Sequence, residues 1–101
     1  MERLTKINQL KAAFRNQLIL APLTKGGNSP FRRLCSDFGC MVQYSEMAYA
    51  REVMKGSRKE LNLLKPSPYD NFFGAQIAAN KAEEAAYAVR KAASLGAKFV
   101  E

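Results

Sequence analysis

The sequence has no histidine and no tryptophan, and its 101 residues include only two cysteines, Cys35 and Cys40. Without histidine, the chain contains no imidazole base and no histidine ligand for a metal ion. Two cysteines supply only half of a tetrahedral zinc site, so we expect no metal centre. No secretory signal is evident, and we therefore expect both cysteines to be reduced thiols of an intracellular protein.

Long apolar runs are also missing. The run at 18–23 is far shorter than the roughly 20 residues that cross a bilayer. Charged residues interrupt the beginning of the chain at Glu2, Arg3, Lys6 and Lys11, which is unlike a secretory signal. A basic amphipathic start is also found in mitochondrial presequences, but this one is poor in serine and leads directly into a predicted strand. We expect no membrane association, and a cytoplasmic or nuclear rather than a mitochondrial protein.

Acidic residues are few compared with basic ones. Sixteen Lys and Arg against nine Asp and Glu give a formal net charge of +7. This excess favours a polyanionic partner, RNA first, although a solvated basic surface explains it equally well. Hydrophobic residues at 48% and charged residues at 25% are typical of a globular chain, and the length allows one domain at most.

The apolar pattern predicts alternating strands and helices. Residues 1–17 carry apolar side chains three or four positions apart and predict a leading amphipathic helix. Continuous apolar segments predict buried strands at 18–23, 40–45 and 72–77, and another from 98 onward. Helical patterns occupy 29–38, 48–64 with a break near Gly56, and 80–96. Repeated strand–helix units predict a parallel sheet, either doubly wound or closed into a barrel.

Helix boundaries follow from capping residues. Ser29 is expected to cap the second helix, with Pro30 in its first turn and Gly39 at its end. Asn80 is expected to cap the last helix, with Glu83 completing a capping box. The face of that helix expected to be apolar consists of Ala82, Ala86, Val89 and Ala93.

Ligands of both parallel architectures meet the carboxyl ends of the strands. This rule selects Ala21, Pro22, Leu23, Glu46, Met47, Gln76 and Glu101. Gln76 is polar within an apolar strand, and it either hydrogen-bonds a ligand or satisfies a neighbouring backbone group. Glu46 is a general acid or base, an electrostatic partner, or a member of a buried ion pair with a lysine.

Two further groups of residues are candidates for a functional role. Cys35 falls on the predicted buried helix face and Cys40 at the beginning of a strand, opposite the ligand edge, so neither is expected to be a nucleophile. Lys25, Arg32 and Arg33 form a basic cluster near the ligand edge. They either pair with phosphates or form a solvated helix face.

Several segments in series resemble the tRNA-dihydrouridine synthases. They are Leu20-Ala21-Pro22-Leu23-Thr24, Pro30-Phe31-Arg32-Arg33-Leu34-Cys35, Ser45-Glu46-Met47-Ala48, Phe73-Gly74-Ala75-Gln76-Ile77 and Gly96-Ala97-Lys98-Phe99-Val100-Glu101. The leucine after the first proline, and Phe-Gly before Ala-Gln, are most similar to the eukaryotic type-three branch. The resemblance covers about residues 17–101.

The resemblance implies the first three to four units of an eight-stranded β/α barrel that holds FMN, with residues 18–101 as its N-terminal part. It implies reduction of the C5–C6 double bond of a tRNA uridine, with NADPH as reductant, after the base is flipped into the pocket. It places Ala21, Pro22 and Leu23 against the flavin ring and Gln76 on its pyrimidine edge. It assigns Glu46 more weakly to the same pocket.

In this family an Asn-x-Gly-Cys-Pro segment follows the strand equivalent to 99–101 and supplies the catalytic cysteine. We therefore expect no catalytic residue within the sequence, and an N-terminal part of a synthase that is inactive alone. The missing C-terminal part, or a partner chain, would cover the open sheet edge. Two alternatives remain: a half-barrel relic that binds RNA or serves as an assembly subunit, and another flavin-dependent barrel.

Overall fold

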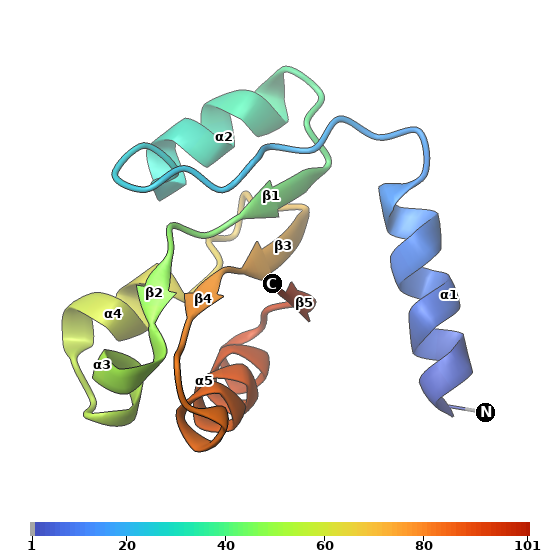
Figure 1. Ribbon diagram of the computed structural model, residues 1–101. Coiled ribbons are helices and arrows are strands. Elements are labelled where there is room, and N and C mark those ends of the chain that lie inside the picture. The colour runs from blue at the N-terminus through green and yellow to red at the C-terminus, as the bar shows by residue number, and fades with distance from the viewer. Residues whose placement is uncertain (1) are drawn as a thin grey trace.

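The structure, a computed structural model, describes residues 2–101 (Figure 1). Its helices are α1 (Glu2–Phe14), α2 (Ser29–Asp37), α3 (Ala50–Met54), α4 (Arg58–Leu63) and α5 (Ala82–Leu95). Its strands are β1 (Val42–Tyr44), β2 (Ala48–Tyr49), β3 (Phe72–Ala75), β4 (Ile77–Ala78) and β5 (Phe99–Val100). The alternation of strands and helices predicted from the sequence is confirmed.

All paired strands are parallel. One sheet has the order β1-β3-β5, with Val42 beside Phe72 and Gly74 beside Phe99. The chain then continues into a second parallel pair, β2-β4, whose strands follow β1 and β3 directly. Neighbouring strands therefore follow one another in sequence. Within residues 2–101 the strand order shows none of the reversal that divides a doubly wound sheet.

The prediction of a buried strand at 18–23 is wrong in extent. Ile19 makes one parallel bridge to Val42, and the Leu20 N–H donates to the Val42 carbonyl at 2.9 Å. Leu18 is nevertheless 67% exposed, because nothing in the described part of the chain covers the outer edge of this segment. Pro22 also lacks the N–H that would extend the ladder. The segment is an uncovered edge beside β1.

One face of the sheet carries aromatic rings. Tyr44 packs edge-on against Phe99 with ring centroids 5.1 Å apart, and Phe72 stacks on Phe99 at 5.6 Å. Phe14, at the end of α1, also lies 5.1 Å from Phe99. Gly74 makes room for this cluster, because a Cβ at that position would collide with the Phe99 ring. The leading helix thus reaches the sheet through its last residue, and none of its residues is buried.

An alanine-rich core lies between α3, α4 and α5, the second parallel pair, and the ends of β3 and β5. Its buried members are Ala48, Ala50, Val53, Leu64, Ala75, Ala88 and Ala92. The prediction for α5 is wrong in its face, since Glu84, Ala88 and Ala92 are buried while Val89 is 42% exposed. Alanine lies on several sides of this helix, so the spacing of the alanines does not identify the buried face.

The helix boundaries agree with the sequence in most places. Gly39 and Gly56 adopt positive φ angles of 97° and 81°, at the end of α2 and in the break between α3 and α4. The cap of α2 is Asn28 rather than Ser29, since its side chain accepts from the Phe31 N–H at 3.0 Å. Both residue types cap well, so the sequence did not distinguish them.

The N-terminus of α5 differs from the prediction. Lys81 occupies the cap position, with no side-chain hydrogen bond to the helix, so Asn80 is not the cap. Asn80 lies one residue earlier and lines a surface hollow. Residues 48–49, predicted as helix, instead form β2, because Ala48 pairs with Ile77 across the second parallel pair.

Candidate functional site

Polar side chains meet where the strands end. The Gln76 Nε2 donates to the Glu101 carboxylate at 2.9 Å, which joins the residue after β3 to the residue after β5. The Gln76 N–H donates to the Ser45 hydroxyl, also at 2.9 Å, next to the end of β1. The carboxyl edge of the sheet therefore brings Gln76 and Glu101 together, as the strand polarity predicts.

Glu46 fastens the loop that follows the first segment. Its Oε1 accepts from the Lys25 N–H at 2.6 Å, and Lys25 adopts a positive φ of 64°. The same loop is closed by the Gly27 N–H, which donates to the Leu23 carbonyl at 2.7 Å. Glu46 thus orders a turn through a backbone amide, whereas an ion pair with a lysine was one of the expected roles.

Ala21, Pro22 and Leu23 lie between this turn and the bridge to β1. Ala21 and Leu23 are exposed and Pro22 is half-buried. The Leu23 carbonyl accepts from the Gly27 N–H within the turn that Glu46 holds, so this turn fixes Leu23. The three residues present a mostly apolar surface next to the polar edge.

Tyr44 belongs to the same edge and was missed from the sequence. Burial, and secondly the nearby negative charge of Glu101, raise the pKa of the Tyr44 phenol above its ordinary value of 10.0. The phenol is therefore neutral at physiological pH and able to donate. The sequence signal that could have found it is its place at the end of a predicted strand, two residues before Glu46.

The basic cluster predicted near the ligand edge does not form. Arg32 is 5% exposed and donates to both carboxylate oxygens of Asp70, at 2.9 and 3.0 Å. A further N–H of Arg32 donates to the Gly27 carbonyl at 2.7 Å, and the guanidinium lies 4.9 Å from the centre of the Phe73 ring. Arg32 is neither a phosphate ligand nor part of a solvated face; it is a buried structural link.

The rest of α2 turns its apolar side outward. Phe31, Leu34 and Phe38 are 37%, 52% and 81% exposed. Polar contacts hold the helix instead, including the hydrogen bond of 2.7 Å from the Asn71 amide to the Ser36 hydroxyl. The apolar face expected to be buried is uncovered in the described part of the chain.

Both cysteines are free thiols, as predicted. Cys35 is half-buried on α2, less enclosed than the core position expected for it. Cys40 is buried at the beginning of β1, where its Sγ lies 3.3 Å from the Val42 carbonyl. This is the amino end of the strand, away from Glu46 and Gln76.

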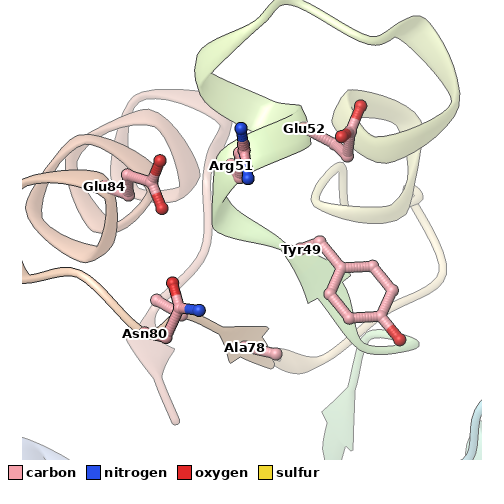
Figure 2. Close-up of a pocket in the computed structure, with 7 residues that line it drawn as sticks. Tyr49, Arg51, Glu52, Ala78, Asn80 and Glu84 are labelled. Atoms are coloured by element: carbon pink, nitrogen blue, oxygen red, sulfur yellow. The ribbon is translucent and has the colours of Figure 1, made fainter.

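A second feature of the carboxyl edge is a hollow of about 450 Å³ beyond β2 and β4 (Figure 2). It lies between α3 and α5, and its lining residues are Tyr49, Arg51, Glu52, Ala78, Ala79, Asn80 and Glu84. No helix in residues 2–101 is long and apolar enough to cross a membrane.

Comparison with known proteins identifies a consistent set of relatives. A family model described as dihydrouridine synthase matches residues 19–101. The chain is similar to a tRNA-dihydrouridine(47) synthase [NAD(P)(+)] of Phaeosphaeria nodorum, at 44% identity over 62% of this chain and 11% of the relative. It is similar to proteins named tRNA-dihydrouridine(47) synthase [NAD(P)(+)]-like of Xenopus tropicalis, at 47% identity over 63% and 10%, and of Mus musculus, at 40% over 74% and 12%.

The chain spans about a tenth of the length of the curated relatives it matches. No solved structure matches it.

Proposed function

Because the chain belongs to the dihydrouridine synthase family, we propose that it forms the first strand–helix units of a flavin-holding β/α barrel that reduces a uridine of tRNA. The sequential order of its parallel strands supports this proposal, since barrel strands follow one another around the ring. The remaining parts of the proposal come from the names of the relatives. These names give tRNA as the substrate, position 47 as the target and NAD(P) as the redox partner.

The carboxyl edge fits the pyrimidine end of a flavin. Gln76 donates through Nε2 to Glu101, and its Oε1 has no hydrogen-bond partner among residues 2–101. That oxygen is free to accept from a ring N–H, while the remaining Nε2 hydrogen is free to donate to a ring carbonyl. The apolar backbone at Ala21, Pro22 and Leu23 suits the flat face of the ring. FMN, when bound, would supply the hydride for the uridine C5–C6 bond, with NADPH as reductant.

The chain's own residues have positioning roles in this proposal. Glu101 fixes the rotamer of Gln76, so that the amide is oriented before a ligand arrives. Glu46 holds the turn beside Leu23, which keeps the apolar wall in place. We assign no catalytic residue and no proton donor within 1–101, because Cys35 and Cys40 lie away from the carboxyl edge.

Exposed apolar surface favours the proposal that further strands and helices pack around this unit. The segment at 18–23 and strand β5 are the two edges of the sheet, and the apolar face of α2 is exposed beside the first of them. A barrel takes roughly 250 residues, so other parts of a longer protein, or a partner chain, would cover these surfaces. This unit alone would be inactive.

The observation that carries the proposal is the paired Gln76 and Glu101 at the carboxyl edge, together with the family. The test is flavin retention by the native polypeptide that carries this sequence. Gln76→Ala removes one or two hydrogen bonds of about 0.5–1.5 kcal/mol each, so we expect flavin to bind about fivefold more weakly. Gln9→Ala, on the exposed surface of α1, is the matched control.

Two results would overturn the proposal. Native polypeptide that holds no flavin contradicts the flavin site altogether. Equal flavin affinity in the Gln76→Ala and Gln9→Ala variants contradicts the role of Gln76. Tight RNA binding without flavin would instead favour the alternative of a basic RNA-binding relic, which the net charge of +7 also suits.

A further inference from the structure

The hollow between α3 and α5 is lined by a glutamate that is mostly enclosed. Glu84, in the first turn of α5, is only 9% exposed, and its side chain lines the hollow (Figure 2). Within residues 2–101 no hydrogen bond or ion pair involves its carboxylate, and the carboxylate oxygens stay accessible from the hollow. Most of the residue is enclosed while its acceptor atoms open into the hollow, so a ligand that donates hydrogen bonds meets two unoccupied oxygens there.

The other walls are complementary to a nucleotide. Arg51, from α3, is exposed and lines the same hollow, where it offers a cation for a phosphate. Tyr49 is 54% exposed on the rim and offers an aromatic face for stacking. Unpaired RNA bases are recognised by this combination of stacking and hydrogen bonds to the Watson–Crick edge.

We propose that this hollow binds an unstacked guanine of the RNA substrate, next to the site that takes the uridine. Guanine carries two adjacent donors on its Watson–Crick edge, N1–H and N2–H, which match the two oxygens of the Glu84 carboxylate. Adenine, cytosine and uracil each place an acceptor beside their donor, and that acceptor would face a carboxylate oxygen. Tyr49 stacks on the neighbouring base and Arg51 contacts the phosphate.

The inference rests on the proposed function for the identity of the RNA, which is tRNA. Location supports the connection, because the hollow lies beyond β4, and β4 begins directly after Gln76. A nucleotide close to the target uridine therefore reaches the hollow from the same edge of the sheet. Its recognition would select among uridines by their neighbours.

The test compares short uridine oligomers that contain one central guanosine, one central adenosine or uridine alone. Binding to the native polypeptide is measured by fluorescence anisotropy. We expect the guanosine oligomer to bind about tenfold more tightly than the adenosine oligomer, the typical discrimination of a bidentate pair. Glu84→Gln replaces one acceptor oxygen with a donor and should abolish that preference. Glu83→Gln, an exposed neighbour with the same charge change, should keep it.

Arg51→Ala should weaken all three oligomers by a similar factor, because a phosphate contact carries no base preference. The inference is overturned if the wild type shows no preference for guanosine, or if Glu84→Gln and Glu83→Gln behave alike. Flavin content and uridine reduction are measured on the same preparations. Normal flavin and reduction without a guanosine preference refute this inference alone, whereas a guanosine preference without flavin refutes the proposed function alone.

Discussion

Removal of the buried Asp70 charge should destabilise the protein more than the substitution of an exposed residue does. The Asp70 carboxylate accepts from Arg32 at 2.9 and 3.0 Å and from the Ser67 N–H at 2.7 Å. The side chains of Arg32 and Asp70 are 6% and 1% exposed. Asp70→Asn keeps the shape but leaves the Arg32 guanidinium buried without its counter-charge.

The expected loss follows from the burial of the pair. Breaking a buried ion pair by removing one partner costs about 3–5 kcal/mol. Domains of this size have total stabilities of about 5–15 kcal/mol, so the loss is a large fraction of the whole. With a urea slope of about 1–3 kcal/mol/M, the unfolding midpoint should fall by about 1 M or more.

The assay is urea unfolding of the native polypeptide that carries this sequence, followed by circular dichroism. Arg33→Met is the matched control on the same helix, because Arg33 stacks 3.9 Å from the exposed ring of Tyr69. That contact is worth about 0.5–1 kcal/mol. A loss for Asp70→Asn no greater than the loss for Arg33→Met would refute the structural role assigned to the pair.

Three other substitutions test individual features. Gly74→Ala forces a methyl group into the Phe99 ring and should cost about 1–3 kcal/mol in urea unfolding; an unchanged midpoint would contradict the packing. Asn28→Ala should lower the free energy of unfolding by about 1 kcal/mol, because α2 loses its cap. The control Ser29→Ala should lower it little. The raised pKa of Tyr44 means that the folded chain keeps the phenolic proton longer than the unfolded chain does. Its contribution to stability is therefore complete below about pH 10 and is lost as the pH rises through the folded pKa. Glu101→Gln should lower that pKa in a phenolate absorbance titration, and an unshifted titration would contradict the charge effect.

Strand polarity made much of the candidate site predictable. Continuous apolar segments located β1, β3 and β5, and parallel strands place their carboxyl ends at one edge. Gln76 and Glu101 follow from that rule alone, without knowledge of their contact. Turn and helix ends at Gly39 and Gly56 were equally clear, because positive φ angles favour glycine.

Contacts between distant segments could not be predicted in this way. Arg32 and Asp70 are 38 residues apart, and nothing in the local pattern of either distinguishes a buried pair from two surface charges. The buried face of α5 was missed because alanine contributes little to an apolar stripe. Glu84 was missed for a different reason: a glutamate in the first turn of a helix is ordinarily exposed to solvent.

We propose that this polypeptide belongs to the machinery that reduces uridine in tRNA, and that the carboxyl edge of its sheet takes part. The most direct measurement is the dihydrouridine content of tRNA from source cells in which the polypeptide has been disrupted, mapped position by position. We expect dihydrouridine to disappear at position 47, the position in the names of the relatives. The wild-type gene should restore it fully and Gln76→Ala only in part. Unchanged dihydrouridine at every position would contradict the account.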